Sequence, residues 1–137
     1  MADLLSAYLH EVAGRRFAWG STDCVMTQFE WVRRRTGIDP AAVCGAGWRS
    51  LREALAVLGS VGGLNGGGVD LYARCGFEQT SRPARGDIGV IEVVRDGAPL
   101  HIAAICMGNT WAFAEEPAGM RVVVTKPVVA WILPEAP

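Results

Sequence analysis

Residues 88–109, IGVIEVVRDGAPLHIAAICMGN, decide the fold that the sequence predicts. The segment 88–94 is short and rich in β-branched residues, Asp96-Gly97 is a turn signal, and 100–107 is apolar again. Two apolar runs separated by such a turn are typical of a β-hairpin. Gly108-Asn109 marks a second turn. We therefore expect two antiparallel strands in this segment and a third strand directly after it.

The chain beyond this hairpin continues in short β-rich runs. TWAFA, residues 110–114, predicts the third strand. GMRVVVTKPVVAWIL, residues 119–133, predicts two more, separated at Lys126-Pro127. The C-terminal half therefore predicts a meander of antiparallel strands.

The N-terminal half has the periodicity of amphipathic helices. DLLSAYLHEVAG, residues 3–14, predicts a helix that Asp3 caps and Gly14 ends. A second helix is predicted from about Asp23 to Thr36, with Gly37 as its end.

The middle of the chain predicts less regular structure. Asp39-Pro40 predicts a short irregular stretch, and residues 50–59 predict a third helix with a capping box. The glycine-dense residues 59–68 predict a loop, and a short helix is expected over about 69–75. Helices first and strands second predict one α+β domain, residues 1–137, with N-terminal helices packed on a C-terminal antiparallel sheet.

Composition argues against several classes of function. The 137 residues carry a formal net charge of −1, and the pI is about 6.1, which disfavours general nucleic-acid binding. No apolar run reaches the ~20 residues of a membrane helix, and the N-terminus has no recognisable secretory signal. We expect folding in a cytoplasm, no nucleic-acid partner and no membrane span.

The four cysteines, Cys24, Cys44, Cys75 and Cys106, form no C-x-x-C pair. Their spacing disfavours a zinc ribbon, and a reducing compartment disfavours disulfides. Most are expected to be small buried hydrophobes. We expect no cofactor, but a metal or iron–sulfur site assembled from dispersed cysteines stays open as a lower alternative.

Cys24 and His101 are the residues that suggest chemistry. Cys24 begins a predicted helix, whose N-terminus lowers a thiol pKa and offers N–H groups to an oxyanion. His101 begins a strand and is the better general base of the two histidines. The alternative for Cys24 is a buried thiol on an amphipathic helix. Asp23 is expected to cap the helix, since its charge would oppose formation of a thiolate.

Three stretches resemble the NlpC-type papain-like cysteine peptidases: WGSTDC (19–24), ARGDIGVI (84–91) and HIAAICMGN (101–109). In that family the nucleophile follows an aspartate at a helix start, and a strand carries the histidine. The chain is more narrowly similar to small proteins encoded in tail modules of phages and prophages, which are related to the peptidase domain of tail-tip assembly proteins. The resemblance covers residues 15–133, approximately.

This resemblance implies a papain-like fold and specific partners. The implied substrate class is the peptidoglycan stem peptide, and the implied partners are other phage tail-tip proteins. The implied location is the virion, in the phage tail, after synthesis in the bacterial host cytoplasm.

The sequence also departs from the family pattern. Val25 and Met26 follow the cysteine where the peptidases have Ser-Gly, and His101 lies one residue early, so that Ile102 takes the expected position. No residue matches the third polar group. We assign Asn109 to this role, with Glu115 as a substitute.

The tryptophans divide by their neighbours. Trp31 and Trp131 are expected in the core, and Trp19 at the rim of the site, together with Asp23. Asp87 is expected to anchor the backbone that enters the sheet.

Two functions follow from these residues. The first is a tail-tip or tail-assembly protein that keeps the papain-like fold and the cysteine but has an incomplete triad. The alternative is an active cysteine amidase or peptidase, with Cys24 as nucleophile and His101 as base.

Overall fold

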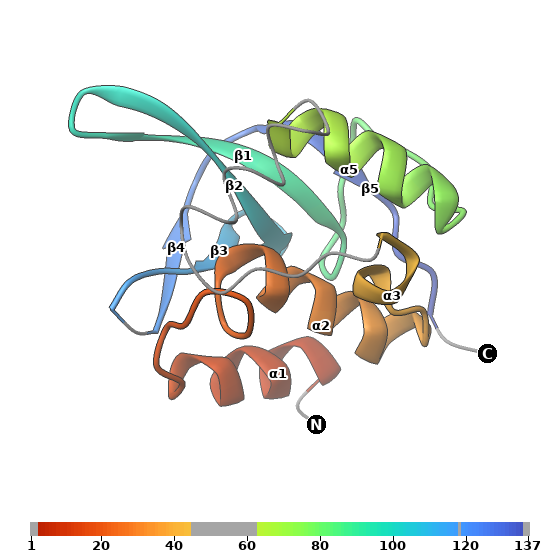
Figure 1. Ribbon diagram of the computed structural model, residues 1–137, viewed down its shortest axis with the longest axis horizontal. Helices are drawn as coiled ribbons and strands as arrows, with labels where there is room; N and C mark the ends of the chain where they lie inside the picture. The colour runs from red at the N-terminus through yellow and green to blue at the C-terminus, as the bar shows by residue number, and fades with distance from the viewer. Residues whose placement is uncertain (1–2, 45–62, 118, 136–137) are drawn as a thin grey trace.

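The computed structural model describes residues 3–44, 63–117 and 119–135. The helices are α1 (Leu4–Ala13), α2 (Cys24–Thr36), α3 (Pro40–Cys44) and α5 (Gly63–Arg74). The strands are β1 (Ile88–Arg95), β2 (Ala98–Cys106), β3 (Trp111–Ala114), β4 (Met120–Val123) and β5 (Pro127–Trp131). The strands form one antiparallel sheet in the order β4-β3-β2-β1-β5, and the helices pack on it (Figure 1). This confirms the α+β prediction and its order of helices before strands.

The ends of α1 and α2 follow from their capping residues. The Asp3 side chain accepts a hydrogen bond from the Ser6 N–H at 2.7 Å, and Asp23 accepts one from the Met26 N–H at 2.9 Å. Gly37 ends α2 with a φ of 81°, in the left-handed region that glycine adopts without strain. The predicted bounds of both helices are confirmed to within about a residue of their caps.

The glycine-rich segment was predicted wrongly. Residues 63–68, which were expected to lie in a loop, form the first half of α5. A Cβ on Gly68 would lie 2.8 Å from the ring of Trp131, so glycine lets the helix pack closely on β5. Residues 40–44 also form a helix, α3, where an irregular stretch was expected. The predicted helix over 50–59 lies outside the described residues.

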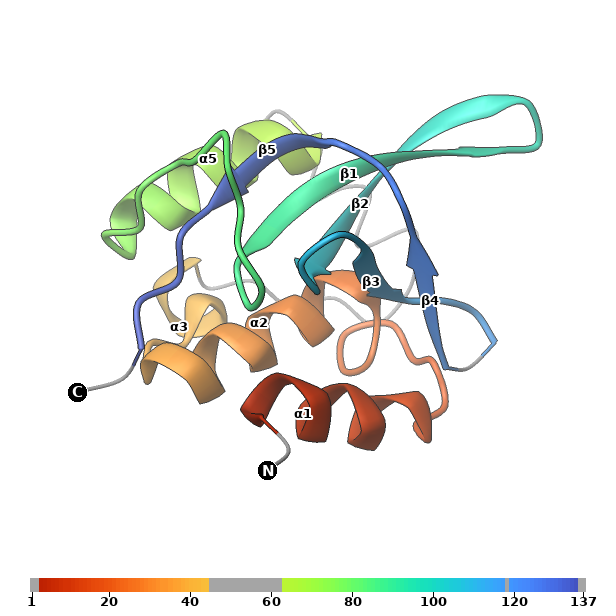
Figure 2. The same cartoon turned by 180° about the vertical axis from the view of Figure 1, so that it is seen from behind.

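The hairpin of β1 and β2 has the geometry that its turn requires. Asp96 and Gly97 have φ values of 51° and 77°, as a type I′ turn needs, and the strands pair without a shift from Arg95↔Ala98 to Ile88↔Ile105. Their inner halves lie within the sheet. The outer half, around the turn, projects from the body of the protein (Figures 1 and 2).

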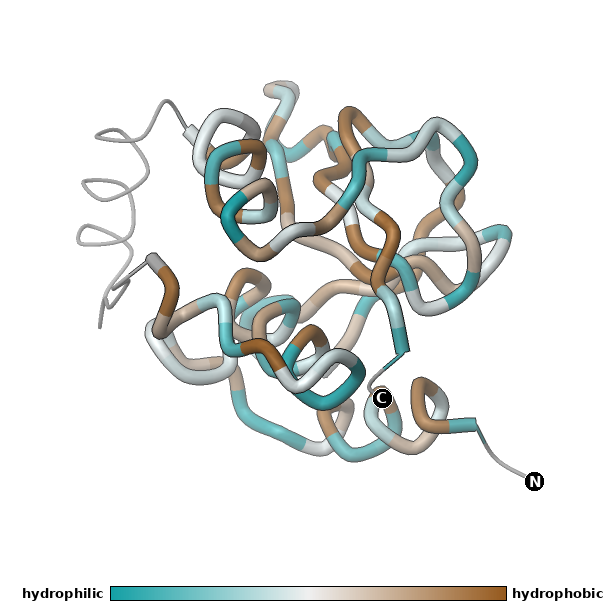
Figure 3. Tube along the Cα trace, turned by 90° about the vertical axis from the view of Figure 1, so that its right-hand side faces the viewer, coloured by the Kyte–Doolittle hydropathy of each residue, from teal (hydrophilic) through white to brown (hydrophobic). Residues whose placement is uncertain are grey.

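Apolar residues cover both faces of the sheet, apart from the projecting outer half of the hairpin. The helix-facing cluster includes Val90, Ala103 and Ile105, together with Trp31 and Trp131, which are 0% and 1% exposed. Their prediction as core residues is confirmed. Figure 3 shows apolar and polar residues alternating along the trace, as expected for elements with one buried face.

The face of the sheet opposite to the helix-facing cluster, which we call the concave face, carries a second apolar cluster. Its buried members are Ile91, Ile102, Ala104, Cys106, Trp111, Phe113 and Ala130. None of the helices among the described residues has the length and apolar character needed to cross a membrane.

Candidate functional site

Cys24 is the first residue of α2, and Asp23 fixes the loop that leads to it. The Asp23 carboxylate is fully buried and accepts hydrogen bonds from the N–H groups of Gly20, at 2.7 Å, and Met26, at 2.9 Å. One carboxylate therefore joins the loop to the first turn of the helix. The predicted capping role of Asp23 is confirmed.

The Cys24 thiol lies at the junction of the two apolar clusters and packs against both. The pKa of Cys24 is raised to about 11, mainly by desolvation; a hydrogen bond with the Ala103 backbone opposes this rise, and the charge of Asp23 adds to it. The helix N-terminus was expected to lower this pKa. The direction is the opposite, because desolvation of a thiolate between apolar clusters outweighs the nearby N–H groups.

His101 lies on the projecting part of the hairpin. Because side chains alternate along a strand, His101 shares the face of Ala103 and Ile105, and Ile102 lies on the concave face. The His101 side chain is 38% exposed, and its Nε2 is 3.3 Å from an oxygen of Glu92, directly across the hairpin.

Cys24 packs against the clusters on both faces of the sheet, and His101 lies further out along β2. The Cys24 thiol is hydrogen-bonded to the backbone of Ala103, which is two residues, about 6.6 Å along the strand, from His101. Within the described part of the chain, no hydrogen bond joins the thiol to the imidazole. Their catalytic roles stay a prediction.

The other predicted site residues lie in three separate places. Asn109 is exposed in the turn between β2 and β3. Glu115 follows β3 and forms ion pairs with Arg95 and Arg121. Trp19 is half-buried, packs on the helix-facing cluster and meets the Phe17 ring edge-on at 4.9 Å between centroids.

Glu92 is the site residue that sequence reasoning missed. It gives His101 the carboxylate partner that neither Asn109 nor Glu115 provides. The sequence does contain the signal, because a two-residue turn at Asp96-Gly97 pairs residue 95 with 98 and hence 92 with 101.

Gln28, one turn after Cys24, was also missed. Its Nε2 donates to the carbonyls of Gly89 and Ala104, both at 2.9 Å, and its Oε1 accepts the Tyr72 hydroxyl hydrogen bond at 2.6 Å. This buried network ties α2 and α5 to the two central strands. It therefore fixes the position of α2, and of Cys24, on the sheet.

The Gly86-Asp87 pair of the ARGD stretch joins three elements. Asp87 accepts hydrogen bonds from the N–H groups of Ala84, at 2.8 Å, and Leu133, at 3.0 Å, and the Trp31 indole donates to the Gly86 carbonyl at 2.8 Å. The prediction that Asp87 anchors the backbone entering the sheet is confirmed.

A metal site finds no support in the part of the chain that the structure describes. There, no three histidine, cysteine or acidic side chains lie close enough together to hold a metal ion. The Cys44 side chain is outside this description.

A family model described as a domain of unknown function, DUF6950, matches residues 1–132. The chain belongs to the DUF6950 family. A search of curated proteins and a search of solved structures each give no match. The match spans Cys24, Glu92 and His101, so all three lie within the DUF6950 domain.

The half-buried Cys24 of this DUF6950 chain is expected to react slowly with iodoacetamide, because its pKa is raised. With a pKa of about 11 against an ordinary 9.0, the thiolate fraction at neutral pH is about a hundredfold lower than in the unfolded chain. The labelling rate, measured by peptide mass mapping, should rise with pH up to about 11. A rate that levels off below pH 8 would contradict the raised pKa.

The same titration affects stability. Because the pKa is raised in the folded state, the contribution of the protonated thiol to the free energy of unfolding is fully present below pH 9.0 and is lost as the pH rises to about 11.

The Cys24→Ser variant is the matched control in the labelling experiment, and labelling in urea gives the unfolded reference rate.

Proposed function

We propose that the chain is a structural protein of a phage or prophage tail, at the tail tip or in tail assembly, with a papain-like fold whose catalytic site is incomplete. The tail assignment rests on the resemblance of WGSTDC, ARGDIGVI and HIAAICMGN to the NlpC-type peptidases and to small tail-module proteins. The order of helices before an antiparallel sheet agrees with such a fold.

The raised pKa and the hydrogen bonding of Cys24 support the part of the proposal that says the site is not catalytic. A thioester forms by attack of a thiolate, or of a thiol whose proton passes to a base within hydrogen-bond reach. The Cys24 thiol has a pKa raised to about 11 and bonds to a backbone group, while His101 pairs with Glu92. Ile102, at the position where the family has histidine, contributes to the concave apolar cluster.

An active cysteine amidase that cleaves peptidoglycan stem peptides is the second candidate, and one observation favours it. His101 and Glu92 form a pair of the kind in which a carboxylate orients a catalytic imidazole. The backbone of Ala103, which bonds to Cys24, is two residues along β2 from His101. A hairpin movement that brings His101 toward Cys24 would complete this arrangement.

A genetic experiment in the encoding phage or prophage separates the two candidates. Deletion of the gene is expected to abolish infectious particles, and the protein is expected in purified tails by mass spectrometry. Complementation with Cys24→Ala or Cys24→Ser should restore the titre, because the structural role needs no thiolate.

Two other results would each contradict a different part of the proposal. If both cysteine variants fold and enter the tail but fail to restore the titre, the chain acts as a cysteine hydrolase. If the wild-type protein is absent from tails and from assembly intermediates, the tail proposal itself is wrong. Circular dichroism of each purified variant excludes loss of the fold as the cause.

A further inference from the structure

The outer half of β1, Glu92–Arg95, has a free edge. The pairing of β1 with β5 stops at Ile91↔Pro127, because proline has no N–H with which to continue the ladder. Beyond that point β1 pairs with β2 alone among the described residues. We call this four-residue segment the β1 edge.

The backbone of the β1 edge is available for pairing. In a two-residue hairpin the pair that closes the turn, here Arg95 and Ala98, exchanges both hydrogen bonds, and the pairs then alternate. The N–H and C=O groups of Glu92 and Val94 are therefore directed away from β2. An added strand could pair with them.

The other edge of the same hairpin is protected. Pro99 lies opposite Val94, at a position whose backbone is directed away from β1. A proline there blocks pairing on the β2 side, which is how natural proteins protect exposed edges. The β1 edge has no proline, and its Val94 is 70% exposed. The contrast marks the β1 edge as a surface for a partner.

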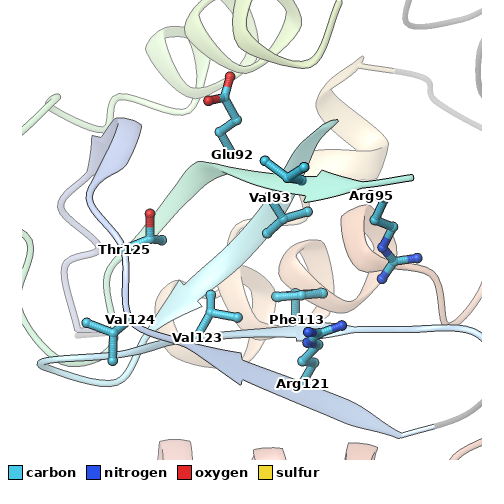
Figure 4. A pocket seen from close by; sticks show the side chains of 9 residues that line it. Glu92, Val93, Arg95, Phe113, Arg121, Val123, Val124 and Thr125 are labelled. Atoms are coloured by element: carbon cyan, nitrogen blue, oxygen red, sulfur yellow. The ribbon is translucent and has the colours of Figure 1, made fainter. Parts of the chain in front are cut away.

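A cavity of about 260 Å³ lies beside the β1 edge, at the open end of the concave face (Figure 4). The residues that line it include Val93, Phe113 and Val123, together with Arg95 of β1 and Arg121 of β4. Val93 and Val123 also pack on the concave apolar cluster. A strand added to the β1 edge would therefore direct alternate side chains into this cavity, toward Val93, Phe113 and Val123.

The charges of this cavity select the partner. Arg95 and Arg121 both contact the carboxylate of Glu115, so two guanidinium groups share one negative charge. Glu92 also lines the cavity, but its side chain points away from the two arginines (Figure 4) and pairs with His101. The excess positive charge favours a carboxylate, and it disfavours a second copy of this chain, whose own arginines would lie opposite.

We propose that the β1 edge binds an extended segment of a partner protein by strand addition. The segment places an apolar side chain in the cavity and, two residues along on the same face, a carboxylate on Arg95 and Arg121. The proposal rests on the edge, the cavity and its charges, and is independent of the tail assignment.

Binding is tested with the ¹⁵N-labelled full chain and an acetylated, amidated peptide, Thr-Val-Thr-Glu-Thr. This probe should shift the amide signals of Glu92 and Val94. The matched peptide Thr-Val-Thr-Lys-Thr should bind at least about tenfold more weakly, because it lacks the carboxylate. Val94→Pro should abolish binding while the rest of the spectrum is kept, since its N–H takes no part in the β1–β2 ladder.

Charge variants and sedimentation complete the design. Arg95→Glu should weaken binding, and Arg82→Glu, an equal change of charge on an exposed loop residue, should not. Equal binding of the lysine peptide, or no shift at residues 92–95 at millimolar peptide, overturns the proposal. So does a concentration-dependent dimer that Val94→Pro abolishes, because the occupant would then be a second copy.

Discussion

Replacing Trp31 with alanine is expected to lower the free energy of unfolding by about 3–5 kcal/mol. Trp31 is 0% exposed, and its ring stacks on Tyr8 at 5.6 Å between centroids. Its indole N–H donates to the Gly86 carbonyl at 2.8 Å. Truncation leaves a large apolar cavity between α1, α2 and the entry to β1, and removes the partner of a buried carbonyl.

Urea denaturation monitored by circular dichroism measures this loss. Trp31→Phe is the matched control, because it keeps an aromatic ring and removes the indole hydrogen bond, and its loss should be clearly smaller. Val94→Ala, at a highly exposed position, should change stability by less than about 0.5 kcal/mol. An effect of Trp31→Ala as small as that of Val94→Ala would contradict the burial of the indole in the core.

Local signals in the sequence predicted most of the fold. Asp3, Asp23 and Gly37 predicted helix ends because capping acts over three or four residues. Asp96-Gly97 predicted the hairpin because a type I′ turn needs positive φ at both positions.

The first half of α5 could not be predicted in this way. Its glycines disfavour a helix locally, and the compensation comes from Trp131, a residue on β5 that lies against Gly68. The contact joins positions 63 residues apart, so no local pattern reveals it.

The chemistry of the site was less predictable than its position. The start of α2 at Cys24 was visible in the sequence, but the direction of the thiol pKa depends on desolvation by two apolar clusters that distant parts of the chain form together. The partner of His101, in contrast, could have been predicted from the sequence. The turn alone pairs position 92 with 101.

Replacing Asp87 with alanine is expected to lower the free energy of unfolding by about 2–4 kcal/mol. Asp87 is 5% exposed, and its two oxygens accept hydrogen bonds from the N–H groups of Ala84 and Leu133. The first bond closes the turn before β1, and the second holds the chain just after β5. Alanine would leave both N–H groups without this acceptor, and the Leu133 bond is buried.

Asp87→Asn is the matched control, because one amide oxygen can replace one of the two carboxylate acceptors, and its loss should be intermediate. Hydrogen exchange at Leu133 should accelerate in Asp87→Ala, since that N–H loses its partner. Iodoacetamide labelling of Cys24 in the folded variant should stay slow, because Asp87 is not among the groups that shift the pKa of the thiol. Full stability of Asp87→Ala with fast labelling of Cys24 would instead place this aspartate in the chemistry of the cysteine, and would revive the hydrolase.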